Sequence, residues 1–455
     1  MGGKAVAVIG AGVSGIIAAK RLRAEGLSVR VFERALGPGG VWSYNSDAKA
    51  LFATPMYDPL ETNLPRDLME FADQPWPEDT PLYPSHQQVL GYIRDYSEGV
   101  EVEYGTEVVD VCKRTPKWPQ RWRVTIRKRD SEERISLDFD AVVSCIGTFD
   151  KPVMPEHDGR AEWEKAYPDT SLQNVLVVGV GPSGSDIAGK LSKVAKTLWQ
   201  STRGDIKRIR NPRIKPVGPI KKLNHKCGSV ELQDGKVLTD VDKIIYCTGY
   251  HYSHSYLRRG VRAKEPLYSD GLRMDDLWEQ MFWIEEPSLV FIGITKDSPT
   301  FLIAQAQAAY AARILAGISV IPLTRVMRNE LRKDLAERVK LDLNVEEKAH
   351  NLRGEWSREY IDTLRGRCEK DAAAFNGHPI TPGNEPFRWT KENRLGHEKP
   401  SSAEKKILHG ESLSAPDLPH TRVSGIQTVP PVPREEVMRN VVALDCGGDM
   451  EEVLR

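Results

Sequence analysis

The sequence predicts an α/β chain with two Rossmann-like dinucleotide-binding domains, one inserted into the other, followed by a helical C-terminal extension. Two observations predict this fold class. An apolar run at Ala5–Ile9 leads directly into the turn GAGVSG, residues 10–15, and a second run at 173–178 leads into GVGPSG, residues 179–184. A buried strand, a glycine-rich turn and a helix in this order form the unit that binds the pyrophosphate of a dinucleotide.

The first unit carries the residue types that such a site needs. Gly10 allows the tight turn, Gly12 lets the backbone approach a pyrophosphate, and Gly15 lets the helix pack closely on the strand. The phosphates are expected at the first turn of the helix, beside Ser14, where free N–H groups point at them. The next strand ends in Glu33, whose carboxylate would accept hydrogen bonds from a ribose 2′-hydroxyl. This chemistry favours FAD or NAD and disfavours a 2′-phosphate.

Several segments between the two units are expected to reach the first dinucleotide. Gly37–Trp42 is a glycine-rich turn before an aromatic residue, and Thr54–Pro77 is interpreted as an ordered loop because apolar residues lie among its prolines. Loops of this kind carry functional residues on a rigid scaffold. A buried strand at Phe139–Gly147 ends where a cofactor could approach, and another strand is predicted over Val100–Val111. The candidate residues in these segments are Gly40, Val41, Trp42, Thr62, Asn63, Val108 and Gly147.

The second unit has the opposite ribose chemistry. Its second strand ends in a hydroxyl and a guanidinium, Ser201 and Arg203, where the first unit ends in Glu33. These groups suit a 2′-phosphate, because they neutralise its charge and supply bidentate hydrogen bonds. The first site should therefore take FAD and the second NADPH. The candidate residues for NADPH are Gly179, Gly181, Ser183, Gly184, Ser201, Arg203, Thr248 and Gly249.

The order of the remaining elements predicts where the domains begin and end. An alternating segment at Trp122–Ile135 predicts an antiparallel strand, and Phe301–Gly317 predicts a long helix packed near the FAD domain. Charged helices are expected over Ile321–Arg367. We therefore expect a first FAD-binding segment at 1–170, an NADPH-binding domain at 171–282, a return segment of the FAD domain at 283–330, a helical extension at 331–399 and an irregular tail at 400–455.

Composition excludes several classes of function. The 64 basic and 64 acidic residues cancel, so no net field favours nucleic acid or an anionic membrane. Six scattered cysteines form no CxxC pair, which predicts reduced thiols, a reducing compartment and no metal site. Because the N-terminus runs straight into the first predicted strand, we expect no signal peptide. Phe301–Leu323, the most apolar long segment, contains Arg313 and is expected to be a core helix and not a membrane anchor. We expect a soluble cytoplasmic protein.

Taken together, the motifs resemble the flavin-containing monooxygenase family, the class B flavoprotein monooxygenases. The matching motifs follow the family's order over roughly residues 4 to 320. They are Gly10–Gly15 with Glu33, Gly39–Trp42, Thr62–Pro65, Gly179–Gly184 and Cys247–Tyr250.

One motif departs from the family pattern. Residues 157–167 have the spacing of the fingerprint FxGxxxHxxxY, with His157 in place of Phe and Trp163 in place of His, while Gly159 and Tyr167 are kept. In the family this segment is thought to link the two domains and support their coupled motion. Its alteration bears on how tightly NADPH oxidation is coupled to oxygenation.

The resemblance implies an NADPH- and FAD-dependent monooxygenase that takes O2 and a small or medium organic substrate. NADPH would reduce FAD, O2 would form a C4a-(hydro)peroxyflavin, and a nitrogen or sulfur atom of the substrate would accept the distal oxygen. Asn63 matches the family's asparagine near flavin N5 and is the candidate catalytic residue. Gln305 is either a flavin contact or an ordinary glutamine of the core helix.

Three other functions stay open at this point. A Baeyer–Villiger monooxygenase would use the same scaffold, although Tyr167 fits the branch that oxidises nitrogen and sulfur slightly better. A flavin reductase or oxidase that releases H2O2 is compatible with the altered fingerprint. A non-catalytic nucleotide-sensing module is disfavoured by both glycine fingerprints and Arg203. The charged helices after Ile321 could pair two copies into a homodimer.

Overall fold

The computed structural model describes residues 3–44, 55–58, 60–114, 121–167, 173–257, 268–269, 271–340, 349–352 and 354–374. The tail expected at 400–455 lies outside these residues. The described residues divide into two compact units: those within 3–43, 64–151 and 251–374 form the first, and those within 44–63 and 152–250 form the second. The chain leaves the first unit at strand β7 (Lys151–Pro152) and returns at β15 (Tyr250–His251).

A six-stranded sheet in the order β18-β19-β20-β6-β1-β2 is the centre of the first unit. Four of its strands run parallel to one another: β20 (Leu289–Phe291), β6 (Ala141–Ser144), β1 (Ala5–Ile9) and β2 (Ser28–Phe32). β20, β6 and β1 are almost entirely apolar, as expected for parallel strands that are covered on both faces, whereas the edge strand β2 exposes Ser28 and Arg30. The antiparallel pair β18 (Leu277–Trp278) and β19 (Phe282–Trp283) extends one edge.

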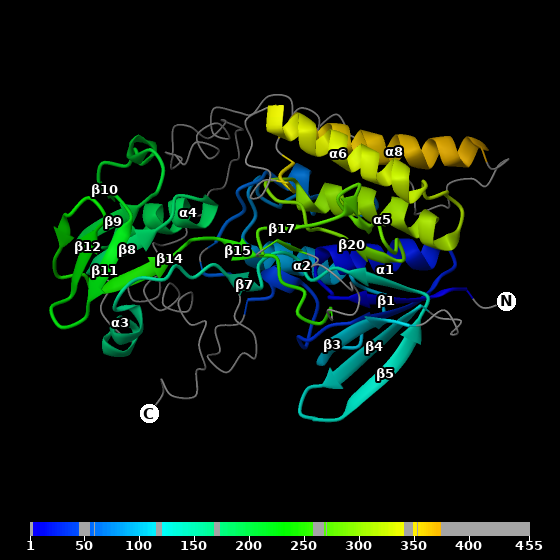
Figure 1. The fold of residues 1–455 in the computed structure, drawn as a ribbon, viewed down its shortest axis with the longest axis horizontal. Helices are drawn as coiled ribbons and strands as arrows, with labels where there is room; N and C mark the ends of the chain where they lie inside the picture. Colours follow the sequence, from blue (N-terminus) through cyan, green and yellow to red (C-terminus); the bar gives the residue numbers. More distant parts are fainter. Residues whose placement is uncertain are drawn as a thin grey trace. The chain divides into compact units, whose positions relative to one another are not determined.

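Helices cover one face of this sheet. α1 (Val13–Ala24) and α5 (Thr300–Ala316) form the first layer, and α6 (Thr324–Lys340) and α8 (Glu355–Ala374) lie above them (Figure 1). Fourteen residues of α5 are buried, because α1 packs on one side of it and α8 on another. The large apolar core of the first unit lies in these layers. None of the helices in the described residues is long and apolar enough to cross a membrane.

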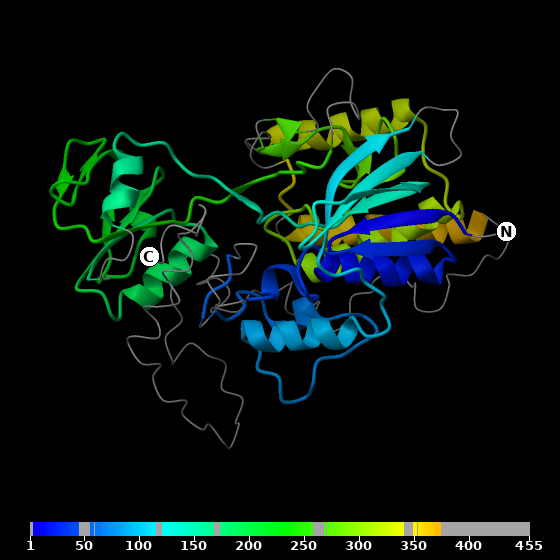
Figure 2. The same cartoon turned by 90° about the horizontal axis from the view of Figure 1, so that it is seen from below.

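The opposite face is covered by an antiparallel meander of β3 (Thr106–Lys113), β4 (Trp122–Lys128) and β5 (Arg134–Phe139). Figure 2, viewed from below, shows these strands lying across the parallel sheet. Alternate residues of the meander, with Trp122 fully buried, pack on the sheet in a second apolar core. The strand expected over Val100–Val111 therefore begins only at Thr106.

The strand expected at Phe139–Gly147 is broken by Asp140. The carboxylate of Asp140 accepts a hydrogen bond from the N–H of Ala5 (2.7 Å), and its own N–H donates to the carbonyl oxygen of Ala5 (2.8 Å). Residues before Asp140 consequently belong to the meander, whereas residues after it belong to the parallel sheet.

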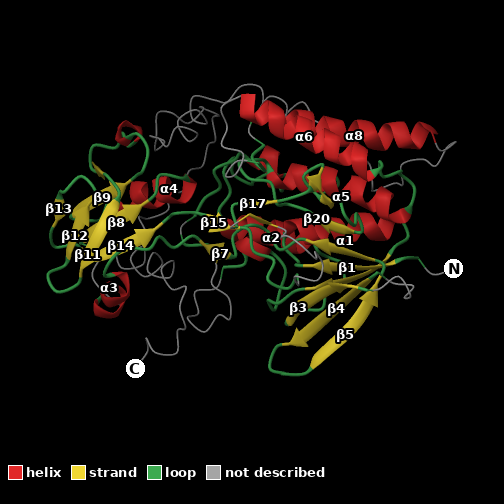
Figure 3. Ribbon diagram, in the orientation of Figure 1, coloured by secondary structure: helices red, strands yellow, loops and turns green. Residues whose placement is uncertain are grey.

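The second unit contains a four-stranded parallel sheet in the order β10-β9-β8-β14, with strands at Lys215–Val217, Thr197–Ser201, Asn174–Val178 and Lys243–Tyr246. α4 (Pro182–Leu191) packs on one face. α3 (Arg160–Ala166) and a three-stranded sheet lie on the other face (Figure 3). The strands of that small sheet are β11 (Ile220–Asn224), β12 (Ser229–Leu232) and β13 (Val237–Leu238).

The other elements in the described residues are short, except for one helix. α2 (His86–Tyr96) begins at a capping box in which Ser85 accepts from the N–H of Gln88 (3.3 Å). This places the cap at Ser85 and leaves His86 buried. The remaining elements are β16 (Tyr268–Ser269), β17 (Arg273–Met274) and the 3₁₀ turns Gly40–Trp42, Arg66–Met69 and Ile206–Arg208.

Candidate functional site

The first glycine turn connects β1 to α1 and contains two positions that tolerate no side chain. Gly10 has φ +98°, and a Cβ atom on it would lie 2.7 Å from the carbonyl oxygen of Cys145. A Cβ atom on Gly15 would lie 1.9 Å from the carbonyl oxygen of Gly10. These distances are far inside van der Waals contact, so the close approach of helix to strand requires glycine at both positions.

The loop at residues 37–42 closes against this turn. The N–H of Gly39 donates to the carbonyl oxygen of Ala11 (3.0 Å). A Cβ atom on Gly40 (φ +56°) would lie 2.9 Å from the Cα atom of Gly12. Val41 and Trp42 follow in a half-buried 3₁₀ turn, and Trp42 packs against the main core. Two glycine-rich segments thus meet through their backbones.

Glu33 lies at the end of β2 and is 8 % exposed. One of its carboxylate oxygens accepts from the N–H of Ala11 (2.6 Å), inside the glycine turn, and the other accepts from the N–H of Ala35 (2.8 Å). These bonds hold the carboxylate beside the turn, and each oxygen keeps a further lone pair. The arrangement fits the predicted role of Glu33 as an acceptor for ribose hydroxyls.

The second glycine turn, between β8 and α4, repeats the first. A Cβ atom on Gly179 (φ +117°) would lie 2.3 Å from the carbonyl oxygen of Cys247. A Cβ atom on Gly184 would lie 2.4 Å from the carbonyl oxygen of Gly179. Gly181 and Ser183 are exposed at the start of α4. The same close contacts between turn, helix and neighbouring strand therefore occur once in each unit.

The N-termini of α1 and α4 suit an anion. Gly12 and Gly181 occupy the N-cap positions, where they offer no side-chain acceptor, and neither helix has an acidic residue in its first turn. α2 differs, because its first turn is satisfied by the Ser85 capping box. Backbone N–H groups at the ends of α1 and α4 can therefore bind phosphate oxygens in the field of the helix dipole. The residues present fit a dinucleotide at each turn.

The predicted phosphate pocket follows β9. The hydroxyl of Ser201 is buried and donates to the carbonyl oxygen of Gly218 (2.9 Å). Arg203 is exposed and forms no ion pair within the described part of the chain. Thr248 lies at the carboxyl end of β14 and donates to the carbonyl oxygen of Val153, and Gly249 is exposed. Arg203 is thus available to an anion, whereas Ser201 already has one protein partner.

The other residues predicted to bind FAD differ in burial and in the partners that they already have. Gly147 is half-buried beyond β6, and Val108 is 8 % exposed in the core beneath the meander. Gln305 is 2 % exposed; its Oε1 accepts from the N–H of Ala72 (2.7 Å), and its Nε2 donates to the carbonyl oxygen of Glu70 (3.0 Å). The amide of Gln305 therefore anchors the loop after residue 69, as a core-helix glutamine does.

Thr62 and Asn63 belong to the segment that clusters with the second unit. Thr62 is buried and Asn63 is exposed. In that segment the hydroxyl of Tyr57 also donates to the carboxylate of Asp186 on α4, and the same carboxylate pairs with Lys190 (2.5 Å). Burial, together with Asp186, raises the pKa of Tyr57. This contact ties the segment before Thr62 to the helix of the second glycine turn.

The altered fingerprint lies within the second unit. Gly159 (φ +83°) begins α3, and a Cβ atom on it would lie 2.2 Å from the carbonyl oxygen of Leu223. Trp163 is 4 % exposed and stacks on Tyr167 with ring centroids 4.6 Å apart. His157 is half-buried, and burial, with a smaller contribution from Arg160, lowers its pKa. The indole of Trp163 therefore acts as core packing against the small sheet.

Sequence reasoning missed Gly293, which follows β20. Gly293 has φ +80°, and a Cβ atom on it would lie 2.2 Å from the Oγ atom of Ser14 on α1. A glycine directly after an apolar strand is the signal that could have identified it. Within the described residues no group of His, Cys, Asp and Glu could hold a metal ion. A separate cavity of about 430 Å³ lies beside α6 and α8, and no predicted site residue lines it.

The chain is similar in sequence to known proteins over most of its length. The family model described as flavin-binding monooxygenase-like matches residues 3–211 and 207–370. A thiol-specific monooxygenase of Saccharomyces cerevisiae is 30 % identical over 353 residues, which cover 70 % of this chain and 78 % of the yeast protein. Flavin-containing monooxygenase FMO GS-OX1 of Arabidopsis thaliana is 30 % identical over 406 residues, 80 % of this chain and 85 % of that protein.

Solved structures show the same fold. The S-allyl-L-cysteine S-oxygenase of Allium sativum superposes with a TM-score of 0.70 at 25 % identity, covering 89 % of this chain and 97 % of that one. An open structure of cyclohexanone monooxygenase superposes with a TM-score of 0.57 at 15 % identity, covering 83 % and 99 %. The predicted fold class of two Rossmann-like domains is confirmed.

Proposed function

The chain belongs to the flavin-binding monooxygenase-like family, and from that premise we propose that it transfers one oxygen atom from O2 to a sulfur or nitrogen atom of a small or medium organic substrate. Membership implies a flavin-dependent monooxygenase that uses FAD and NADPH. Sulfur is the first candidate, because similar proteins are named a thiol-specific monooxygenase and an S-allyl-L-cysteine S-oxygenase.

One observation carries the assignment of the two cofactors. The same glycine turn occurs twice, and the side chain after it is a carboxylate in the first unit and a guanidinium in the second. Beside the first turn a buried carboxylate, Glu33, is held ready for ribose hydroxyls. Beyond the second turn the exposed guanidinium of Arg203 is available to a phosphate. A carboxylate repels a 2′-phosphate and a guanidinium attracts it, so FAD belongs to the first unit and NADPH to the second.

The reactive chemistry, hydride uptake and activation of O2, is supplied by FAD when it is bound. The chain contributes binding, orientation and proton control. The N-termini of α1 and α4 bind the pyrophosphates, and Glu33 and Arg203 select the riboses. Asn63 carries an exposed amide, which can donate a hydrogen bond without delivering a proton at neutral pH. We assign it the role of a hydrogen-bond donor in the reaction.

The experiment that tests the cofactor assignment compares Arg203→Ala with Arg213→Ala. Arg213 is an exposed arginine of the same basic loop and serves as the control. Arg203→Ala should raise the KM for NADPH by about tenfold or more and leave the KM for NADH nearly unchanged, because only NADPH carries the 2′-phosphate. Equal changes for the two nucleotides, or an equal effect of Arg213→Ala, would remove Arg203 from the phosphate pocket.

Rapid mixing distinguishes the proposed reaction from its alternatives. The NADPH-reduced enzyme is mixed with oxygenated buffer, with thiols, sulfides, amines or ketones present, and the flavin absorbance is followed. An absorbing transient and an oxygenated sulfur or nitrogen product support the proposal. Oxygenated ketones alone would indicate a Baeyer–Villiger enzyme. Stoichiometric H2O2 with every substrate would indicate a reductase or oxidase.

A further inference from the structure

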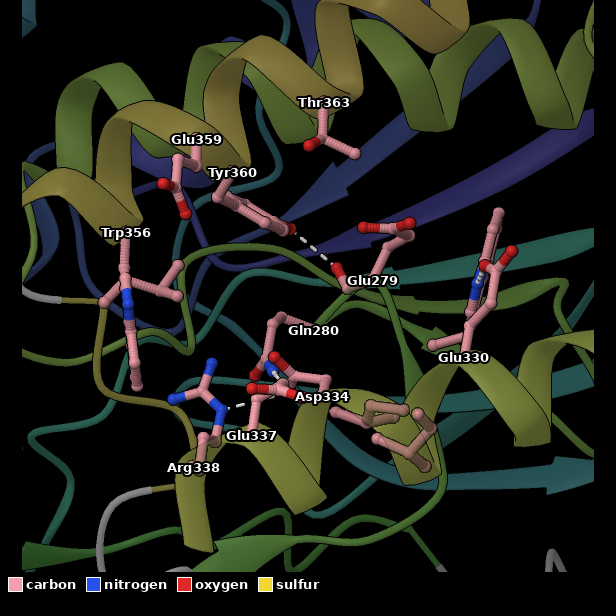
Figure 4. A pocket seen from close by; sticks show the side chains of 14 residues that line it. Glu279, Gln280, Glu330, Asp334, Glu337, Arg338, Trp356, Glu359, Tyr360 and Thr363 are labelled. Carbon is pink, nitrogen blue, oxygen red and sulfur yellow. Dashed lines mark hydrogen bonds and ion pairs between the residues drawn. The ribbon is translucent and has the colours of Figure 1, made fainter. Parts of the chain in front are cut away.

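A chain of three hydrogen bonds, two of them buried, connects the loop after β20 through helix α8 to the turn after β18. The N–H of Gly293 donates to Oε1 of Gln307 on α5 (3.0 Å). Nε2 of Gln307 donates to the hydroxyl of Tyr360 on α8 (2.9 Å), and that hydroxyl donates to the carbonyl oxygen of Glu279 (2.6 Å). Figure 4 shows the last of these bonds. We call these four residues the α8 relay.

The relay has only one consistent arrangement of donors and acceptors. The N–H of Gly293 can only donate, so the carboxamide of Gln307 must present its oxygen to Gly293 and its nitrogen to Tyr360. The hydroxyl of Tyr360 then has one proton, and it goes to the carbonyl oxygen of Glu279. Gln307 is fully buried, so water cannot readily replace a partner that its amide loses, whereas Tyr360 is 9 % exposed and lines a cavity.

One end of the relay reaches the first glycine turn. Gly293 lies so close to Ser14 that no side chain fits between them, and Ser14 is the second residue of α1. The N–H groups of this first turn are those expected to bind the FAD pyrophosphate. A shift of Gly293 by a few tenths of an ångström would therefore act directly on the start of α1, because close-packed atoms transmit displacement.

The other end lies in the wall of the cavity between β18, α6 and α8. Glu279 and Gln280 form the turn between β18 and β19 with φ +49° and +54°, values that favour glycine. The hydrogen bond from Tyr360 and the contact of Gln280 with His350 (2.6 Å) hold this turn in place. Arg367 of α8 pairs with the side chain of Glu279. α8 therefore holds this turn through Tyr360 and Arg367, which lie on the same side of the helix about two turns apart.

We propose that Tyr360 and Gln307 are positioning residues for FAD: through Gly293 they hold the first turn of α1 in the conformation that retains the cofactor. The proposal rests on FAD binding at the first glycine turn. It gives α8, which lies outside both nucleotide folds, a specific role in retaining the flavin. The residues act through Gly293 and Ser14.

The test uses Tyr360→Phe in the full-length holoenzyme, with Ser357→Ala as the control. Both changes remove one buried hydroxyl of α8. Ser357 donates to the carbonyl oxygen of Leu352 and takes no part in the relay. FAD release is followed by the rise in flavin fluorescence after dilution, at a temperature where circular dichroism shows all proteins folded. The unfolding temperature of each protein is measured in parallel.

Tyr360→Phe should accelerate FAD release by about tenfold, since Nε2 of Gln307 loses its acceptor and the amide that holds Gly293 is no longer fixed in orientation. Ser357→Ala should release FAD at a rate within about twofold of the wild-type rate, even if its unfolding temperature falls as much as that of Tyr360→Phe. Equal release rates for all three proteins, or equal acceleration by both changes, would overturn the proposal.

Two further results keep the test decisive. If Tyr360→Phe does not fold, Gln307→Met replaces it, because methionine is flexible, similar in length and unable to form either bond of the relay. That variant should release FAD about as fast as expected for Tyr360→Phe. A release rate equal to that of the wild type would overturn the proposal. If the wild type itself carries no FAD after purification, the cofactor assignment to the first turn fails instead.

Discussion

His254 gives the first unit an acid-sensitive site whose effect can be calculated. Its ring is 1 % exposed and contacts the rings of Phe291 and Tyr256 at centroid distances of 5.0 and 5.9 Å. Neither ring nitrogen has a hydrogen-bond partner among the described residues. Burial lowers the pKa of His254 to about 4, against a smaller opposing effect of Asp150. The folded protein therefore keeps this histidine neutral at pH values where an unfolded chain would protonate it.

The sign and size of the effect follow from linkage. Below about pH 6.5 the unfolded state binds this proton and the folded state does not, so stability is lost as the pH falls toward the folded pKa. The loss due to His254 is about 2 kcal/mol at about pH 5 and about 3 kcal/mol at about pH 4. Above about pH 7 it is close to zero.

The assay compares the wild type with His254→Leu by urea unfolding of the holoenzyme at about pH 7.5 and about pH 5. Leucine is similar in volume and has no group to protonate. The stability of the variant relative to the wild type should rise by about 2 kcal/mol between the two pH values. His350, whose pKa burial lowers to about 3, is present in both proteins and cancels. A relative stability that is the same at both pH values would refute the reasoning.

Three further predictions concern the cofactor sites. Gly15→Ala should abolish FAD binding, because its Cβ atom would meet the carbonyl oxygen of Gly10 at 1.9 Å. The flavin content of the purified protein measures this. The control Gly91→Ala, at an open position of a helix, should keep FAD and raise the free energy of unfolding by about 0.5–1 kcal/mol. Glu33→Gln should weaken FAD binding by about tenfold in a fluorescence titration, because an amide has one acceptor oxygen for the two N–H groups that the carboxylate now holds, and unchanged affinity would contradict this. Asn63→Ala should keep FAD and NADPH oxidation but lose oxygenated product, with H2O2 in its place; an unchanged product yield would exclude the assigned role.

Much of the fold could be predicted because its signals are local. The strand at Ala5–Ile9, the glycine turn and the helix after it lie within one short stretch, and the structure has them where the sequence places them. Likewise, the chain turns at Gly317 in the left-handed conformation that ends α5. Family membership and dependence on FAD and NADPH are confirmed by the comparisons. Each of these rests on residue types at fixed spacing, which a sequence displays directly.

What could not be predicted depends on partners far apart in the chain. The break at Asp140 requires a hydrogen bond to Ala5, which no local pattern announces. The turn at Glu279 and Gln280 lacks the glycine or asparagine that identifies such turns, because α8 and His350 stabilise it from outside. For Gly293 the sequence shows a glycine after an apolar strand, but its close approach to Ser14 depends on residues 279 positions apart.

The insertion of one unit into the other sets the order in which the protein can be completed during synthesis. β1 and β6 emerge early, but their neighbour β20 and the covering helix α5 are made only after the whole of 152–250. The inserted unit has all its strands before then, so it can fold while the sheet of the first unit consists only of β6, β1 and β2 and still lacks β18, β19 and β20. At about 5–20 residues per second, α5 also waits several seconds for α8. The apolar surface that chaperones would meet on the nascent chain is therefore that of the N-terminal segment.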